Sequence, residues 1–247
     1  MYLKSRVAST DCCPFATKRY VRILIMNEPL IVLASNSPRR REIIAWLGMP
    51  YTTTSADIDE TPRDGETAKE YVMRLAQEKA HACARFAPFG GLVLAADTTV
   101  ADGEQIIGKP RDREDAVRFL TQLRNRTHLV HSAIVMLLPS KGTSVSDLCS
   151  TQVKMRAYTD DEIQAYVESG DALDKAGAYA IQHEGFHPVS KMGGCFASVM
   201  GLPLCHVERN LRKLGYGAHG GLPYRCQDEL SYTCPIFKRV LSGELIG

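Results

Sequence analysis

One carboxylate stands where packing alone would not place it. Asp97 directly follows the apolar run at residues 92–96, so the sequence predicts a charged group beside the core. A carboxylate in that place needs partners. A bound metal ion or a catalytic role would supply them, and the structural alternative is a helix cap or an ordinary salt bridge. Asp57, Asp59 and Glu60 add carboxylates after a second predicted strand.

Two lysines stand in similarly constrained places. Lys79 lies on the apolar stripe of a predicted helix, seven residues after Val72 and four after Leu75. It either extends along the surface to reach water or points into a cleft toward a phosphate group. Lys109 follows a predicted hairpin within the sequence Gly-Lys-Pro, which holds a second cation on a constrained loop.

The first predicted strand, at residues 30–34, runs into the sequence Ser-Asn-Ser-Pro-Arg-Arg-Arg. Ser37 is the expected N-cap of a helix, and Pro38 is its expected first residue. Free backbone N–H groups, the helix dipole and the guanidinium groups of Arg39 and Arg40 would together favour a phosphate there. A capped helix with solvated arginines is the alternative.

In combination, these features predict metal-assisted phosphoryl chemistry. Acidic groups would hold a divalent cation and orient water, while cationic groups would bind a polyphosphate. The sequence shows neither a Ser/His/Asp nor a Cys/His arrangement for nucleophilic catalysis. It also lacks the GxxxxGK[ST] motif, which excludes a P-loop protein.

The elements that would position these residues alternate along the chain. Strands are predicted at residues 30–34, 51–55, 91–96, about 128–138 and about 147–158, with a hairpin at 99–107. Helices are predicted to follow the N-caps Ser37, Thr67, Asp112 and Thr159, and a last helix covers about 203–214. The pattern predicts an α/β protein with a mixed central β-sheet flanked by helices. Ligands bind such open sheets beyond the carboxyl ends of the strands.

Composition excludes several classes of protein. The 247 residues include 30 Lys and Arg against 28 Asp and Glu, a balance too even for electrostatic binding of nucleic acid to be expected. No apolar run approaches the roughly 20 residues of a membrane-spanning helix. Eight cysteines without a CxxC pair, and no clear signal peptide, predict free thiols in the cytoplasm. Zinc is disfavoured because the spacing matches no standard site among Cys195, Cys205, His206, Cys226 and Cys234.

Three regions are predicted along the chain. Residues 1–29 carry an excess of basic residues without clear periodicity, which predicts a flexible N-terminal extension with Met26 as an alternative start. Residues 30–214 are the predicted catalytic domain. Residues 215–247 are rich in glycine and predict a C-terminal extension, either with a short helix near 236–241 or draped over the surface.

Five segments together resemble the Maf (septum formation) family of nucleoside triphosphate pyrophosphatases. They are Leu-Ala-Ser-Asn-Ser-Pro-Arg-Arg (33–40), Ala-Asp-Thr (96–98), Gly-Lys-Pro (108–110), Asp-Lys-Ala-Gly-Ala-Tyr-Ala-Ile-Gln (174–182) and Val-Met-Gly-Leu-Pro (199–203). They occur in the family's order over roughly residues 30–214. The resemblance implies two lobes around a cleft, hydrolysis of a nucleoside triphosphate between its α- and β-phosphates, a divalent metal (Mg²⁺ or Mn²⁺), and a homodimer.

The same resemblance implies roles for individual residues. Asp97 matches the catalytic base, and Asp59, Lys79 and Lys109 match further cleft residues, with Asp97 and Asp59 as the expected metal ligands. The expected substrate-binding residues are Ser35, Ser37, Arg39, Arg40, Thr98, Lys175 and Gln182.

The motif at 174–182 is similar to that of the branch acting on dTTP and UTP. The Gln182 amide both donates and accepts hydrogen bonds, so it could pair with the O4 and N3–H edge of a pyrimidine. Phe196 departs from the family, which commonly has a tyrosine there. Two alternatives stay open: the same chemistry on 7-methyl-GTP or on ITP and XTP, and a non-catalytic regulator of cell division that binds nucleic acid through residues 1–29.

Overall fold

A computed structural model describes residues 28–217 and 220–246. Its strands and α-helices, in chain order, are β1 (Ile31–Ala34), α1 (Pro38–Ala45), β2 (Tyr51–Thr54), α2 (Ala68–Cys83), β3 (Leu92–Asp102), β4 (Gln105–Ile107), α3 (Arg113–Leu123), β5 (Thr127–Leu138), β6 (Thr143–Met155), α4 (Asp160–Glu168), β7 (Val189–Gly193), α5 (Phe196–Val199), α6 (Leu204–Lys213), α7 (Leu222–Glu229) and α8 (Phe237–Leu241). The predicted N-terminal extension lies outside the described residues as far as residue 27. Every helix of the described part is too short or too polar to cross a membrane.

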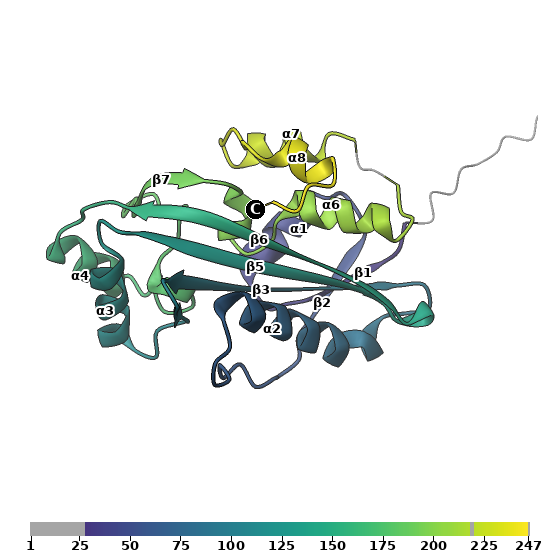
Figure 1. Ribbon diagram of the computed structural model, residues 1–247, viewed down its shortest axis with the longest axis horizontal. Helices are drawn as coiled ribbons and strands as arrows, with labels where there is room; N and C mark the ends of the chain where they lie inside the picture. The colour runs from purple at the N-terminus through teal and green to yellow at the C-terminus, as the bar shows by residue number, and fades with distance from the viewer. Residues whose placement is uncertain (1–27, 218–219, 247) are drawn as a thin grey trace, which may run out of the picture.

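The sheet has seven strands in the order β2-β1-β3-β5-β6-β7, with β4 paired to β3 (Figure 1). β1 pairs in parallel with β2 and β3, and the remaining pairs are antiparallel. The sheet is therefore mixed and is flanked by helices, which confirms the predicted fold class.

Local capping signals place the helices as predicted. The Ser37 hydroxyl caps α1 by accepting from Arg40 N, and Pro38 is the first residue of the helix. Thr67 before α2 and Thr159 before α4 both form complete capping boxes. These reciprocal bonds satisfy backbone groups that the first helical turn leaves without partners.

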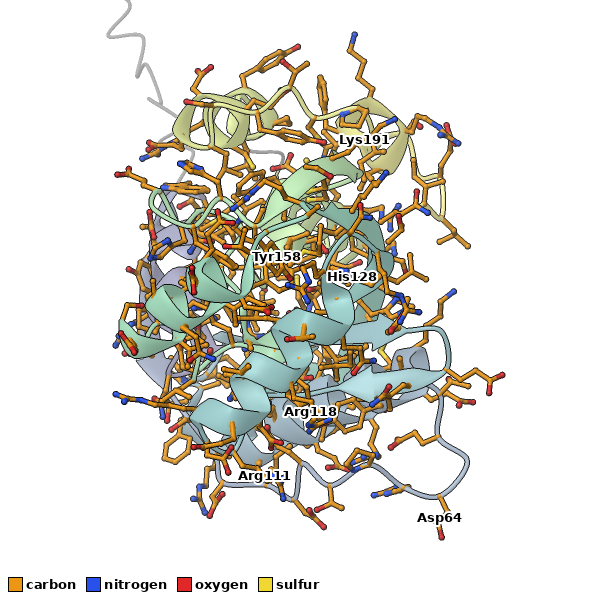
Figure 2. The ribbon with its side chains drawn as sticks, turned by 90° about the vertical axis from the view of Figure 1, so that its left-hand side faces the viewer. Asp64, Arg111, Arg118, His128, Tyr158 and Lys191 are labelled. Carbon is orange, nitrogen blue, oxygen red and sulfur yellow. The ribbon has the colours of Figure 1, made fainter. Side chains whose placement is uncertain are left out.

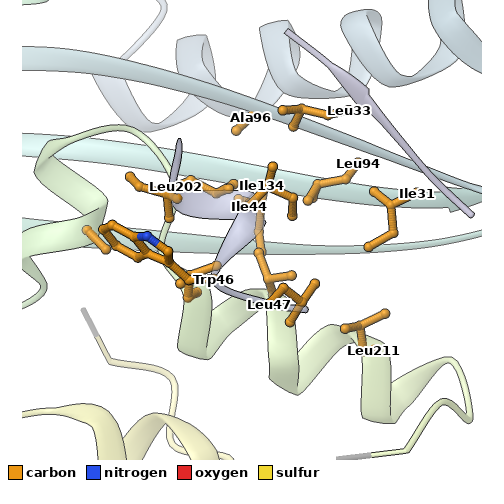
Figure 3. Close-up of a cluster of buried hydrophobic side chains, with 14 of the residues drawn as sticks. Ile31, Leu33, Ile44, Trp46, Leu47, Leu94, Ala96, Ile134, Leu202 and Leu211 are labelled. Atoms are coloured by element: carbon orange, nitrogen blue, oxygen red, sulfur yellow. The ribbon is translucent and has the colours of Figure 1, made fainter. Parts of the chain in front are cut away.

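Side chains alternate between the two faces of the sheet, and each face has its own core. Ile31 and Leu33 of β1 pack with Ile44 of α1 and Leu211 of α6 on one face (Figure 3). Val32, between them in sequence, packs against α2 on the other face. This two-residue period is the pattern expected of a strand covered on both sides.

A third core lies at the far end of the long strands, under α3 and α4. Figure 2 shows this end, with Tyr158 and His128 in its interior and Arg111 and Arg118 on its surface. Both arginines bind the carboxylate of Asp115, at 2.6 and 2.7 Å. The two groups of helices, α1, α2 and α6 at one end and α3 and α4 at the other, form two lobes on one sheet (Figure 1).

Strand β3 is longer than predicted, and this changes the setting of Asp97. Parallel pairing with β1 ends at Ala95, but antiparallel pairing with β5 continues through Asp97 to Ala101. The predicted strand end at residue 96 is therefore wrong. A continuous partner strand keeps the backbone extended, and Asp97 lies inside β3 just past the end of β1.

The C-terminal segment is folded against the rest of the molecule. Residues 222–229 and 237–241 form α7 and α8, which lie over α6 on its side away from the sheet (Figure 1). The predicted helix near 236–241 is confirmed as α8. Helices α7 and α5 and strand β7 were not predicted from the sequence.

Candidate active site

A cleft of about 390 Å³ opens beyond the carboxyl end of β1, between the two lobes. Five cationic and three acidic side chains line it: Arg39, Arg40, Lys79, Lys109 and Lys175, and Glu60, Asp97 and Asp174. The wall also includes Ser35, Ser37, Thr98 and Gln182, so the fold brings together every predicted site residue except Asp59. An excess of cations around a few carboxylates is suited to a polyphosphate accompanied by a metal ion.

Lys79 joins the two carboxylates of the cleft. Its ammonium lies 2.6 Å from Asp97 Oδ1 and 2.7 Å from Glu60 Oε1. The side chain leaves the apolar stripe of α2 and lines the cleft, where it pairs with carboxylates instead of extending along the surface to reach water. Among the described residues, Asp97 Oδ2 has no hydrogen-bond partner, which leaves one oxygen of this buried carboxylate for a ligand.

The two carboxylates differ in pKa although they share one lysine. Burial raises the pKa of Asp97, and this outweighs the lowering by the charges of Lys79 and Arg40. Burial alone would raise the pKa of Glu60. The hydrogen bond and charge of Lys79, together with the charge of Lys109, outweigh burial, so the pKa of Glu60 is lowered. Two carboxylates whose environments move their pKa values apart are suited to different roles. The lowered pKa keeps Glu60 ionised, and the raised pKa makes Asp97 the more basic of the two.

Asp59 does not line the cleft. Its exposed carboxylate accepts a hydrogen bond from Thr61 N at 2.9 Å. The next residue, Glu60, takes the place predicted for Asp59. The loop has no regular secondary structure at this point, so no periodicity in the sequence could show which of the adjacent carboxylates faces Lys79.

Tyr71 of α2 fixes the loop that carries Glu60. Its hydroxyl donates to Glu60 O at 2.8 Å, and Arg74, one helical turn later, donates to Thr61 O at 3.1 Å. Sequence reasoning did not single out either residue, although both lie on the first turns of a helix whose N-cap was predicted.

Arg40 is bound to the protein on three sides. It donates from Nε to Gly201 O at 2.9 Å, from Nη2 to Thr98 Oγ1 at 3.2 Å and from Nη1 to Ser35 Oγ at 3.4 Å. Burial lowers its pKa, partly offset by the charge of Asp97. Arg40 therefore joins α1, β3 and the segment after α5, and contributes a fixed positive charge to the cleft.

Donor directions are fixed in the hydrogen bonds behind Thr98. Ser132 Oγ donates to Ser198 O at 2.7 Å, which uses its only proton. The 2.7 Å contact between Thr98 Oγ1 and Ser132 Oγ must then be donated by Thr98. Thr98 also accepts from Arg40, so its hydroxyl positions the cleft wall.

The remaining cations differ in how firmly they are held. Lys175 is buried and binds the carboxylates of Asp171 and Asp174 at 2.8 and 2.6 Å, so its charge is neutralised within the protein. Arg39 makes a longer contact of 3.4 Å with Asp174. Among the described residues, Lys109 has no ion-pair partner and is exposed, so its charge is available to a ligand.

The donor set of the cleft fits a hard divalent cation that is partly coordinated by its substrate. Asp97 and Glu60 present carboxylate oxygens to the same space. No cluster of three or more His, Cys, Asp or Glu suited to a metal ion occurs within residues 28–217 and 220–246. Mg²⁺ is commonly held by one or two carboxylates together with phosphate oxygens and water. Within the same described ranges, the cysteines and His206 considered for zinc also form no such cluster.

The loop that carries Gln182 depends on Gly177. This glycine has φ +71°, and a Cβ there would lie 2.8 Å from Val100 Cγ2. Its N–H donates to Gly108 O at 3.0 Å, which ties the loop to the segment that carries Lys109.

We expect Gly177→Ala to lower kcat/KM about tenfold or more, because strain and a clash of this size cost about 1–3 kcal/mol. Steady-state kinetics check this, with Gly103→Ala, also at positive φ (+64°) but with no atom near its Cβ, as the control. Equal losses in the two variants would contradict it.

The chain is similar over most of its length to known proteins. The family model of Maf-like proteins matches residues 30–214. The dTTP/UTP pyrophosphatase of Myxococcus xanthus is 48% identical over 189 residues, covering 76% of this chain and 94% of that protein. The proteins of the same name from Anaeromyxobacter dehalogenans and Methylococcus capsulatus are each 43% identical, covering 76% of this chain and 95% and 92% of those proteins. The motifs in the cleft and these matches agree: the chain belongs to the Maf-like protein family.

Proposed function

We propose that this protein hydrolyses dTTP and UTP to the nucleoside monophosphate and pyrophosphate, with the help of a divalent metal. The observation that carries the proposal is the pair of carboxylates, Glu60 and Asp97, joined by Lys79 inside a cation-rich cleft. Membership of the Maf-like family and the similarity to dTTP/UTP pyrophosphatases support the substrate class.

In the proposed mechanism, Asp97 accepts a proton from the attacking water. Its raised pKa makes it a better base than an exposed aspartate. Lys79, Lys109 and Arg39 bind the phosphate oxygens and stabilise the negative charge that grows on them. A divalent metal, Mg²⁺ or Mn²⁺, would be held by Glu60 with the phosphate oxygens, or by Glu60 and Asp97 if Asp97 is a metal ligand instead of the base. When bound, it would supply Lewis-acid polarisation of the phosphoryl group.

Gln182 is proposed to read the base. It is exposed at the cleft, and among the described residues its amide has no hydrogen-bond partner. An amide can accept from a pyrimidine N3–H and donate to O4, a pattern that cytosine does not present.

We expect Gln182→Ala to lower the ratio of dTTP to CTP turnover about tenfold, at the magnitude of one or two lost hydrogen bonds. Competition assays with the two nucleotides measure this ratio, and an unchanged ratio would remove Gln182 from base recognition.

The substrate class is tested by pyrophosphate release from dTTP, UTP, CTP, 7-methyl-GTP and ITP, each with Mg²⁺ and with Mn²⁺. The proposal requires dTTP and UTP to be turned over fastest. Preference for 7-methyl-GTP or ITP would keep the roles of Asp97 and Lys79 and change the base. If folded protein releases pyrophosphate from none of them, the proposal fails, and salt-sensitive binding of nucleic acid that depends on residues 1–29 becomes the function to test.

A further inference from the structure

The family model ends at residue 214, yet the chain continues into helices α7 and α8. These helices share a core with the sheet. Leu222 and Cys226 of α7 are buried in the same apolar cluster as Leu204 and Leu211 of α6, and Val240 of α8 is fully buried. The segment 220–246 is thus packed as an integral layer over α6.

A buried ion pair fixes the end of this segment. Arg209 of α6 binds the Asp147 carboxylate with Nε and Nη2, the Nε bond being 2.7 Å long. Its third nitrogen, Nη1, donates to Val240 O at 3.2 Å and to Glu244 O. A guanidinium presents donors in a rigid planar fork, so β6, α6 and the end of α8 are held in one arrangement.

His206 adds a second bond of the same kind. Its Nε2 lies 3.0 Å from Ile246 O, and a carbonyl oxygen only accepts, so Nε2 carries the proton. Burial lowers the pKa of His206, which keeps the ring neutral.

Between α7 and α8, the segment contacts the backbone that precedes the cleft-lining residues 199–201. The Tyr232 hydroxyl donates to Gly194 O at 3.1 Å, and its ring packs on Phe196 with centroids 5.6 Å apart. Gly194 itself cannot be replaced without strain, because its φ is +139° and a Cβ would lie 3.0 Å from Thr151 Oγ1. Tyr232 therefore holds the entry to α5 at a point where the backbone has little freedom.

The segment held by Tyr232 leads directly to Arg40. After Gly194 comes the single-turn helix α5, and Val199, Met200 and Gly201 then line the cleft. Gly201 O accepts the 2.9 Å hydrogen bond from Arg40 Nε. A shift of this short rigid turn would move the carbonyl that orients the guanidinium.

We infer that the C-terminal segment 220–246 is a positioning element of the active site, acting through Tyr232 on residues 194–201 and so on Arg40. Its kinetic consequence rests on the proposed function. Its structural consequence does not, because the contacts of Tyr232 with Gly194 and Phe196, and that of Gly201 with Arg40, exist without substrate.

The test compares Tyr232→Phe, Tyr232→Ala and a control, Tyr224→Phe, in the full chain. Tyr224 is exposed in the same segment and contacts Phe237 through its ring. We expect Tyr232→Phe to raise KM for dTTP about fivefold, the magnitude of one hydrogen bond, and Tyr232→Ala to raise it further. The control should match the wild type. A merely structural role would lower the folded fraction, and with it the apparent kcat, at unchanged KM.

Hydrogen exchange provides a readout that does not depend on activity. In the Tyr232 variants, exchange should quicken at the amides of Met200, Gly201 and Leu202, which donate to carbonyls of α5, and stay unchanged in β5. Unchanged exchange at these amides overturns the inference whatever the kinetics show. Faster exchange in variants of a protein that turns over no triphosphate would uphold the positioning role and refute the proposed function.

Discussion

Replacing Asp97 by asparagine is expected to lower the turnover of dTTP about a hundredfold or more. The substitution keeps the size of the side chain and removes its charge, so the group accepts no proton and is a poor ligand for a divalent cation. General-base catalysis alone contributes about 10²–10⁴ in rate. Steady-state pyrophosphate release by the variant and the wild type measures the loss.

Asp102→Asn is the matched control for this variant. Asp102 ends the same strand but binds Arg126 at 3.1 Å and Gln122 at 3.0 Å, outside the lining of the cleft. It should turn over dTTP at nearly the wild-type rate. Near-normal turnover by Asp97→Asn, in protein with the wild-type thermal midpoint, would refute the role of Asp97.

Glu60→Gln is expected to have the second largest effect, and its neighbour supplies the control. Glu60 lies 2.7 Å from Lys79 Nζ, whereas Asp59 is exposed and binds only its own loop. Loss of the Glu60 charge should raise the Mg²⁺ concentration for half-maximal activity about 10–100-fold, the range seen when groups that support a metal site are removed. Asp59→Asn should leave that concentration unchanged.

Titrations of activity with Mg²⁺ distinguish the two positions. If Asp59→Asn shifts the metal requirement and Glu60→Gln does not, then Asp59 and not Glu60 takes part in metal binding. If neither substitution shifts it, the second carboxylate has no part in metal binding.

Most of the framework could be predicted because its signals are local. The caps at Ser37, Thr67 and Asp112 satisfy backbone N–H groups within one helical turn, so a few neighbouring residues are enough to predict each helix start. Lys79 could also be identified from nearby residues, because a charged side chain on the apolar stripe of a helix needs water or a partner of opposite charge. The strand end before Asp97 was wrong because β5, distant in the sequence, extends the ladder of β3.

The site was harder to predict where side chains are oriented by distant contacts. Lys175 was expected to bind substrate, but its ammonium is enclosed by Asp171 and Asp174, and sequence does not show which of several nearby charges pair. Thr98 and Arg40 line the cleft as expected, yet their hydrogen bonds lie mostly within the protein. Tyr232 could not be connected with the cleft at all, because its contact with Gly194 spans 38 residues.

The products that the full chain forms from dTTP with Mg²⁺ or Mn²⁺ show which phosphoanhydride bond the protein hydrolyses. Phosphorus NMR of the reaction separates the two possible cleavages. We expect thymidine monophosphate and pyrophosphate in equal amounts, with no orthophosphate, and formation of both about a hundredfold or more slower in Asp97→Asn. Thymidine diphosphate with orthophosphate, or product formation by Asp97→Asn at nearly the wild-type rate, would refute the proposed reaction.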